Sequence, residues 1–169
     1  GTDKIPEDAV RKIRELLAGF SAISARESVS AKQLSQTTGR DVAWVCDPTL
    51  LHDAAFWGAF TAPVQAPKGK YLLCYFLESR PWYFIRAKKL AKGLGLRIKL
   101  IPSRWEHLSS EYVIDDAVGP REFVSLFQHA EYVLTDSYHG SIFSMIFEKN
   151  FQYLLRFHPD DPASQNIRI

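Results

Sequence analysis

One stretch decides the fold that we expect: Tyr132-Val133-Leu134-Thr135-Asp136-Ser137-Tyr138-His139-Gly140-Ser141-Ile142-Phe143. It begins as an apolar strand, breaks into the polar hexapeptide 136–141, and continues as a helix with an apolar face. The carboxyl end of a strand therefore meets the amino end of a helix. Unpaired backbone N–H groups and the positive end of the helix dipole attract anions at such a junction. We interpret the junction as a phosphate site that contains a titratable histidine, His139.

The same alternation of strand and helix runs along the rest of the chain. The predicted strands cover residues 21–25, 42–46, 71–77, 96–101, 132–134 and 152–157. The predicted helices start at Pro6, Ser28, Pro81, Gly119 and Gly140. Strands that alternate with helices imply right-handed crossovers, so we expect an α/β fold: Rossmann-like parallel sheets with helices on both faces.

The stretch 62–70, rich in Pro, Ala and Gly, is the predicted linker between two domains. Residues 71–169 would form a four-stranded Rossmann-like half, truncated at its C-terminus. Residues 1–61 would supply the last helices and two strands of another such half. We therefore expect the chain to be a piece of a longer protein.

Composition narrows the classes of function. The net charge of the 169 residues is only +2, which gives no reason to expect nucleic-acid binding. No apolar run approaches the ~20 residues that span a membrane, so the expected location is the cytoplasm. Cys46 and Cys74 lie in apolar runs and are expected to be reduced core residues. The histidines show no metal-ligand spacing, and no P-loop or complete G-x-G-x-x-G indicates ATP or NAD, so no metal or cofactor is expected.

Ligands of parallel sheets gather at the carboxyl ends of strands, and two such ends here are unusually polar, 24–28 and 136–141. Arg26 could bind phosphate or carboxylate with its forked guanidinium, or could pair locally with Glu27 or Glu15. His139 is interpreted as functional because Gly and two Ser surround it at a helix start.

Several neighbours of these residues keep two interpretations. Ser137 and Ser141 could cap the helix or contact a ligand, whereas Asp136 is expected to cap or orient the loop. Asp47-Pro48-Thr49 is interpreted as a turn that leads out of the sheet, with a ligand or interdomain role as the alternative. Arg156 ends the last strand, either as an anion contact or as a solvated residue. Trp82 and Tyr83 are expected to pack on a helical face, and the role of Trp105 stays open.

Five blocks, in this order, resemble the polysaccharide pyruvyl transferase family. They are Ser24-Ala25-Arg26-Glu27-Ser28, Asp47-Pro48-Thr49-Leu50-Leu51, Tyr71-Leu72-Leu73-Cys74-Tyr75-Phe76-Leu77, Gly119-Pro120-Arg121-Glu122-Phe123 and, most specific, Leu134-Thr135-Asp136-Ser137-Tyr138-His139-Gly140-Ser141-Ile142-Phe143-Ser144. The glycine-rich start of the family's amino-terminal domain and its closing helices are absent, so this piece could be inactive on its own.

The resemblance implies a two-domain, GT-B-like architecture with an active site in the cleft between the halves. It implies transfer of the pyruvyl group of phosphoenolpyruvate, as donor substrate, to two hydroxyls of a glycan sugar, giving a cyclic ketal. The acceptor would be a glycan or lipid-linked saccharide of exopolysaccharide biosynthesis, and the protein could associate with the inner face of the membrane. By position, His139 and Arg26 match residues that the family uses around the donor. The hypothesis adds Ser137, Gly140, Ser141, Glu27 and Arg156 as substrate-binding residues, with Gly140 and Ser141 offering backbone N–H groups.

Two rival functions remain at this point. A GT-B-like glycosyltransferase would hold the diphosphate of a nucleotide sugar at the same His-Gly helix start. A non-catalytic anion-binding module would use the same groups without turnover.

Overall fold

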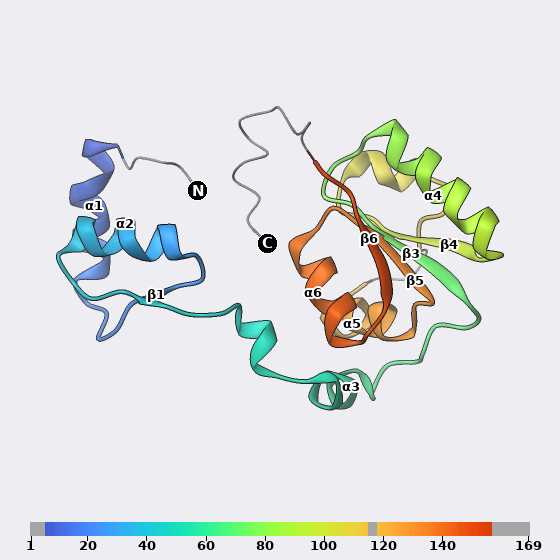
Figure 1. The fold of residues 1–169 in the computed structure, drawn as a ribbon, viewed down its shortest axis with the longest axis horizontal. Helices are drawn as coiled ribbons and strands as arrows, with labels where there is room; N and C mark the ends of the chain where they lie inside the picture. Colours follow the sequence, from blue (N-terminus) through green and yellow to red (C-terminus); the bar gives the residue numbers. More distant parts are fainter. Residues whose placement is uncertain (1–5, 115–117, 157–169) are drawn as a thin grey trace. The chain divides into compact units, whose positions relative to one another are not determined.

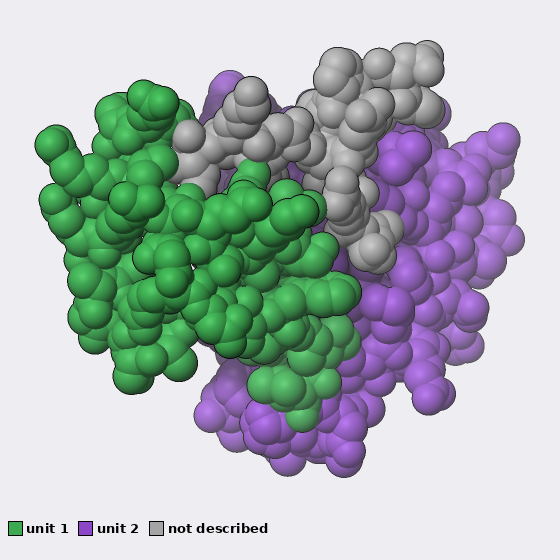
Figure 2. Space-filling view, turned by 60° about the vertical axis from the view of Figure 1, so that its left-hand side comes forward, with its two compact units in different colours: residues 1–51 green, residues 52–169 purple. Residues whose placement is uncertain are grey.

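The computed structural model describes residues 6–114 and 118–156, and these fall into two compact units that divide between Leu51 and His52 (Figures 1 and 2). The alternation of strands and helices predicted an α/β protein with parallel sheets and flanking helices. The structure confirms this fold class. None of the helices in the described ranges combines the length and the apolarity that a membrane crossing requires.

The first unit contains two helices and a short parallel ladder. Helix α1 (Glu7–Leu17) follows Pro6, and its first turn carries Glu7 and Asp8, as suits the positive end of the helix dipole. Strand β1 (Ser24–Ala25) pairs in parallel with β2 (Ala43–Trp44). Helix α2 (Ser28–Thr38) ends at Gly39, whose φ of 69° is the left-handed conformation of a helix C-cap. The predicted cap at Ser28 is one residue late, because Glu27 occupies the N-cap position.

The second unit is built on a four-stranded parallel sheet with the order β4-β3-β5-β6. The strands are β3 (Tyr71–Tyr75), β4 (Arg97–Ile101), β5 (Tyr132–Thr135) and β6 (Asn150–Tyr153). All three strand pairs are parallel. This sheet is the four-stranded Rossmann-like half that the pattern predicts.

Helices cover both faces of this sheet (Figure 1). Helix α4 (Pro81–Leu94) lies on one face, and α5 (Pro120–His129) and α6 (Tyr138–Ile146) lie on the other. Alternate residues of β3 serve the two cores: Leu72 and Cys74 face α4, whereas Tyr71 and Leu73 face α5 and α6. A strand buried on both faces explains the unbroken apolar run in the sequence.

Helix α3 (Ala54–Thr61) is the element that the sequence pattern does not predict. The Asp53 side chain caps it by accepting from Phe56 N at 2.9 Å. The helix packs against α5, and Thr61 Oγ1 lies 2.6 Å from Gln128 Oε1. Residues 52–61 therefore pack with the second unit, whereas the predicted domain boundary lies later, at 62–70.

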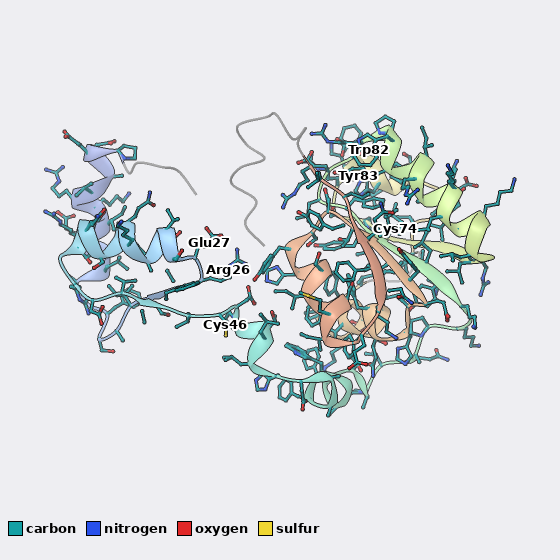
Figure 3. The ribbon with its side chains drawn as sticks, in the orientation of Figure 1. Arg26, Glu27, Cys46, Cys74, Trp82 and Tyr83 are labelled. Atoms are coloured by element: carbon teal, nitrogen blue, oxygen red, sulfur yellow. The ribbon has the colours of Figure 1, made fainter. Side chains whose placement is uncertain are left out.

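Two further expectations change in detail. Two short 3₁₀ helices lie in segments for which no helix is predicted. They are η1 (Pro48–Leu51), which follows Asp47, and η2 (Trp105–Ser109), which follows β4. Cys74 is buried as expected, but Cys46 is exposed, because β2 has only two residues and neither of its side chains is covered (Figure 3).

Candidate functional site

The carboxyl edge of the second sheet is where the site is expected. The chain leaves β3 for β4 on one side and returns to β5 on the other, so β3 and β5 are the neighbours at which the strand order reverses. Ligands of open α/β sheets bind outside such a reversal.

Asp136 is a buried residue at the point where the strand order reverses. Its carboxylate is fully buried and accepts from Leu77 N at 2.6 Å and from Glu78 N at 3.1 Å. It thereby ties the residues after β3 to the end of β5, and the Tyr83 hydroxyl lies 3.4 Å from its second oxygen. The expectation that Asp136 orients the loop agrees with these bonds, and a ligand must lie outside this carboxylate.

Burial raises the pKa of both the Asp136 carboxyl and the Tyr83 hydroxyl. Desolvation raises the pKa of the Asp136 carboxyl, while the two backbone N–H groups and the charge of Arg156 act in the opposite direction. Desolvation and the neighbouring Asp136 raise the pKa of the Tyr83 hydroxyl as well. Asp136 is therefore a positioning residue with no path to solvent, which makes it unsuited to proton transfer with a substrate.

The start of α6 is held by its own serines. Ser137 is the N-cap, and its Oγ accepts from Gly140 N at 3.3 Å. Ser141 N donates to Ser137 O at 3.0 Å, and the Ser141 hydroxyl donates to the same oxygen at 3.2 Å. The two N–H groups that we expected to offer to a ligand, those of Gly140 and Ser141, thus already donate within the protein. The capping interpretation of Ser137 describes this geometry.

Gly140 is required by packing against its own strand. A Cβ on Gly140 would overlap Thr135 Oγ1 and would lie 3.1 Å from both Thr135 Cβ and Cγ2. The close backbone approach that the sequence suggests is therefore made to Thr135. It brings the first turn of α6 directly onto the end of β5.

His139 lies in this first turn and is exposed, unlike its buried neighbours Ser137, Gly140 and Ser141. Its ring meets the Tyr138 ring edge-on, with centroids 5.4 Å apart. The backbone thus presents an imidazole at the positive end of a nine-residue helix, at the carboxyl edge of β5.

Arg156 follows β6, the strand beside β5, and belongs to the same edge. It lies close enough to Asp136 for its charge to lower the pKa of that carboxyl. Its Nε is buried and makes no hydrogen bond to any described residue. Arg156 is therefore a partly buried cation beside the start of α6, rather than a solvated strand end.

Two further arginines at this edge escaped the sequence analysis. Arg80 is the N-cap of α4, and its Nε is also buried without a hydrogen-bond partner in the described ranges. Arg104 follows β4, donates from Nε to Leu77 O at 2.6 Å, and lies 3.4 Å from Glu78 Oε1. Each lies three residues after a predicted strand, which is the signal that could have found them.

Arg26 and Glu27 belong to the first unit, where Arg26 directly follows β1 (Figure 3). Arg26 NH1 lies 3.0 Å from Asp47 Oδ2, and NH2 lies 3.3 Å from Glu27 Oε1. The buried Asp47 also accepts from Thr49 N and Oγ1, at 3.0 and 2.6 Å. The local pair with Glu27 is thus present, and Asp47, interpreted first as a turn residue, also holds the guanidinium.

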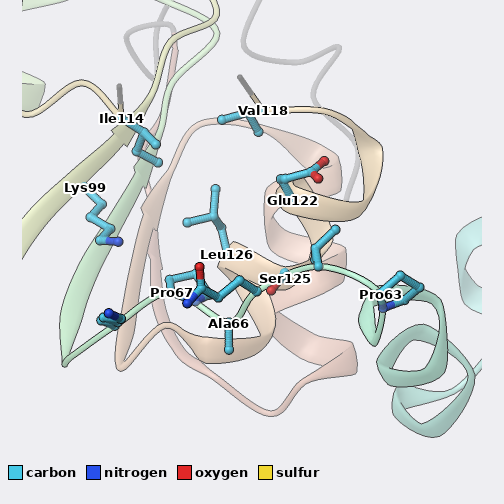
Figure 4. Close-up of a pocket in the computed structure, with 12 residues that line it drawn as sticks. Pro63, Ala66, Pro67, Lys99, Ile114, Val118, Glu122, Ser125 and Leu126 are labelled. Atoms are coloured by element: carbon cyan, nitrogen blue, oxygen red, sulfur yellow. The ribbon is translucent and has the colours of Figure 1, made fainter. Parts of the chain in front are cut away.

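A separate hollow of about 690 Å³ lies elsewhere in the second unit (Figure 4). The segment 63–68, Lys99 of β4, and Glu122 and Ser125 of α5 line it. It contains none of the predicted site residues. Across residues 6–114 and 118–156, no three His, Cys, Asp or Glu side chains gather as metal ligands would.

Comparison with solved structures identifies proteins of similar fold. The chain is similar to two structures of the wall teichoic acid polymerase TagF, one of them from a crystal soaked with CDPG. The first has 15% identity and a TM-score of 0.50 over 85% of this chain and 41% of that one. The soaked structure has 15% identity and a TM-score of 0.51 over 91% and 42%. The chain thus spans less than half of the length of these proteins, and the likeness supports the expected GT-B-like fold.

A search of curated proteins returns no match. The family model of the polysaccharide pyruvyl transferases matches residues 1–154, which is most of the chain. The resemblance of the five blocks is therefore confirmed, and the chain belongs to the polysaccharide pyruvyl transferase family.

Proposed function

We propose that this protein transfers the pyruvyl group of phosphoenolpyruvate to two hydroxyls of one glycan sugar. Membership of the family supports a transferase that acts on a glycan. The observation that carries the donor assignment is the exposed His139 in the first turn of α6, beside the point where the strand order reverses.

The charges at this edge suit a small dianionic donor. Phosphoenolpyruvate carries a phosphate and a carboxylate, and each needs cationic or N–H partners. The helix dipole of α6, the imidazole of His139 and the guanidinium of Arg156 supply positive charge at one edge of the sheet. Ser137, Gly140 and Ser141 would act by shaping this turn, because they hydrogen-bond to one another.

Arg26 and Glu27 are the candidate donor-binding residues of the first unit. Asp47 fixes the Arg26 guanidinium from one side, which gives the forked group a set direction. An arginine held in this way loses less conformational entropy when it binds a carboxylate or phosphate.

The reaction needs one proton donor and one leaving-group stabiliser. A protonated His139 would give its proton to the methylene carbon of the donor, and a sugar hydroxyl would add to the central carbon. The first hydroxyl gives its proton back to the imidazole, the carbon–oxygen bond to phosphate breaks, and phosphate leaves. The second hydroxyl then adds to the central carbon and gives its proton to the departing phosphate. A general acid of this kind contributes about 10²–10⁴-fold to the rate. No redox cofactor is needed, because the methylene carbon is reduced by protonation as the central carbon is oxidised by addition, and the net change is zero.

A glycosyltransferase is the second candidate. The fold likeness to a TagF structure soaked with CDPG favours it, since a nucleotide-linked donor also carries phosphates. The start of α6 could hold a diphosphate through the same dipole. The two candidates differ in the group that the acceptor receives.

Turnover assays test the choice. The protein is incubated with phosphoenolpyruvate and glycan acceptors, free phosphate is measured, and the acceptor is analysed by mass spectrometry. We expect phosphate release together with a pyruvyl ketal on the acceptor, and loss of both in His139→Ala with an unchanged circular dichroism spectrum. Glycosyl transfer from a nucleotide sugar without phosphate release from phosphoenolpyruvate would contradict the proposal, and no turnover with either donor would favour the non-catalytic module.

A further inference from the structure

The outer side of α4 carries an unusual combination of side chains. Trp82 and Ile85 are exposed by 45% and 68%, and Lys89 and Lys92 follow them at helical spacing. At about 100° per residue, these four positions fall within one narrow sector of the helix surface. Tyr83, in contrast, is fully buried against the sheet, although it starts from the same turn as Trp82 (Figure 3). The expected helical-face packing is thus complete for Tyr83 and partial for Trp82, whose ring meets the Tyr83 ring edge-on with centroids 4.4 Å apart.

The 3₁₀ helix η2 carries a second pair of exposed apolar side chains. It lies beside α4, since the His107 ring contacts the Phe84 ring with centroids 5.9 Å apart. Trp105 and Leu108 of η2 are exposed by 79% and 64%. Four large apolar side chains therefore point to solvent from two adjacent elements, more than scattered single exposed residues would give.

Helix α4 carries charge of one sign only, whereas η2 contributes one acidic residue, Glu106. Helix α4 contains Arg86, Lys88, Lys89 and Lys92 and no Asp or Glu. Glu111 lies 3.8 Å from Lys88, and Arg86 donates to Gln152. Within residues 6–114 and 118–156, neither Lys89 nor Lys92 has an acidic partner. Exposed Trp and Ile side chains beside unpaired lysines are the pattern by which a helix lies on a bilayer with anionic headgroups.

We propose that α4 and η2 form a docking surface for an anionic lipid bilayer. The lysines attract the headgroups, and the four apolar side chains enter the boundary between headgroups and acyl chains. This inference stands apart from the proposed pyruvyl transfer, because it requires only lipid and not donor or acceptor. It would place the carboxyl edge, whose Arg80 begins α4, close to substrates held in the membrane.

Vesicle co-sedimentation tests the proposal with the chain as it is. Vesicles of phosphatidylcholine alone are compared with vesicles that also contain phosphatidylglycerol, at low and high salt. We expect binding only when phosphatidylglycerol is present, weakened by salt, with a blue shift of tryptophan emission. The double variant Lys89→Gln/Lys92→Gln should bind on the order of 30-fold more weakly, since each lysine contributes about fivefold.

A matched control separates this surface from general charge attraction. The variant Arg11→Gln/Lys12→Gln removes the same charge from exposed positions of α1. It should bind like the unaltered chain, whereas Trp82→Ser/Ile85→Ser should lose binding with an unchanged circular dichroism spectrum. The proposal would be overturned if the chain bound both vesicle types equally, or if the α1 control lost as much binding as the α4 variants. It would also be overturned if this surface caused the chain to associate with itself in the absence of lipid.

Discussion

The contact between Gly140 and Thr135 supports the sharpest stability prediction. A Cβ at position 140 would overlap Thr135 Oγ1 and approach two carbons of the same side chain to 3.1 Å. Thr135 Oγ1 cannot yield easily, because it donates to Tyr75 O at 2.6 Å and accepts from Ser137 N at 3.0 Å. The substitution Gly140→Ala must therefore displace the first turn of α6 or break these bonds.

The magnitude follows from three contributions. Overpacking a rigid site costs about 1–3 kcal/mol. Weakening the two hydrogen bonds of Thr135 costs about 1 kcal/mol each if they are lost. Replacing Gly by Ala inside a helix returns at most about 1 kcal/mol. We expect Gly140→Ala to lower the free energy of unfolding by about 2 kcal/mol.

A second glycine provides the control. Gly93 lies inside α4, and a Cβ there would meet nothing within 4 Å. Gly93→Ala should therefore raise the free energy of unfolding by up to about 1 kcal/mol. Both variants are measured by denaturant unfolding followed by circular dichroism.

A double variant identifies the partner of the clash. Thr135→Ala removes Oγ1 and Cγ2, so Gly140→Ala should cost at least about 1 kcal/mol less in that background than alone. If Gly140→Ala is as stable as Gly93→Ala, or if the costs of the two substitutions simply add, the proposed contact does not constrain α6.

Three further changes probe the charges of the two units. Asp136→Asn should lower the free energy of unfolding by about 1–3 kcal/mol, because an amide cannot accept from both backbone N–H groups that the carboxylate satisfies; a thermal midpoint equal to that of the unaltered chain would argue against this tie. Burial lowers the pKa of the His107 imidazole, so the unfolded chain takes up a proton first as the pH falls below 6.5, and stability should decline there but less so in His107→Gln; parallel profiles of stability against pH would contradict the assignment. Arg26→Lys should raise the donor Michaelis constant, because an ammonium cannot reproduce the fork, and Asp47→Asn should raise it less; unaltered constants in both would leave Arg26 as a surface pair.

Much of the second unit was predictable because its local signals agree with its packing. The apolar run at β3 is buried on both faces, and Pro81 and Pro120 stand in the first turns of α4 and α5. Gly39 ends a helix in the left-handed conformation, as its position suggested. These features act over a few residues and can be seen in the sequence.

Helix α3 was missed for a physical reason. Apolar residues such as Phe56, Trp57 and Phe60 lie all around it, so it shows no polar face and no helical period. Its stability comes from packing on α5, which is distant in the sequence. The Asp53 cap was the one local signal.

The sequence indicated where the candidate site could lie, but not which hydrogen bonds and ion pairs its residues make. The strand-to-helix junction at 136–141 indicated where an anion site could lie. The tie from Asp136 to the residues after β3, and the pairing of Asp47 with Arg26, join groups that are far apart in the sequence. Such partners are decided by the register of parallel strands, which one sequence does not reveal.

The most direct test of the account is whether the chain binds phosphoenolpyruvate through His139. Isothermal titration of phosphoenolpyruvate compares the unaltered chain with His139→Ala and with His129→Ala, which removes an exposed histidine from the last turn of α5. We expect saturable binding that UDP- and GDP-sugars do not displace, weakened about tenfold or more in His139→Ala and unchanged in His129→Ala. Tight binding of a nucleotide sugar with none of phosphoenolpyruvate, or equal affinity in the two histidine variants, would contradict the account.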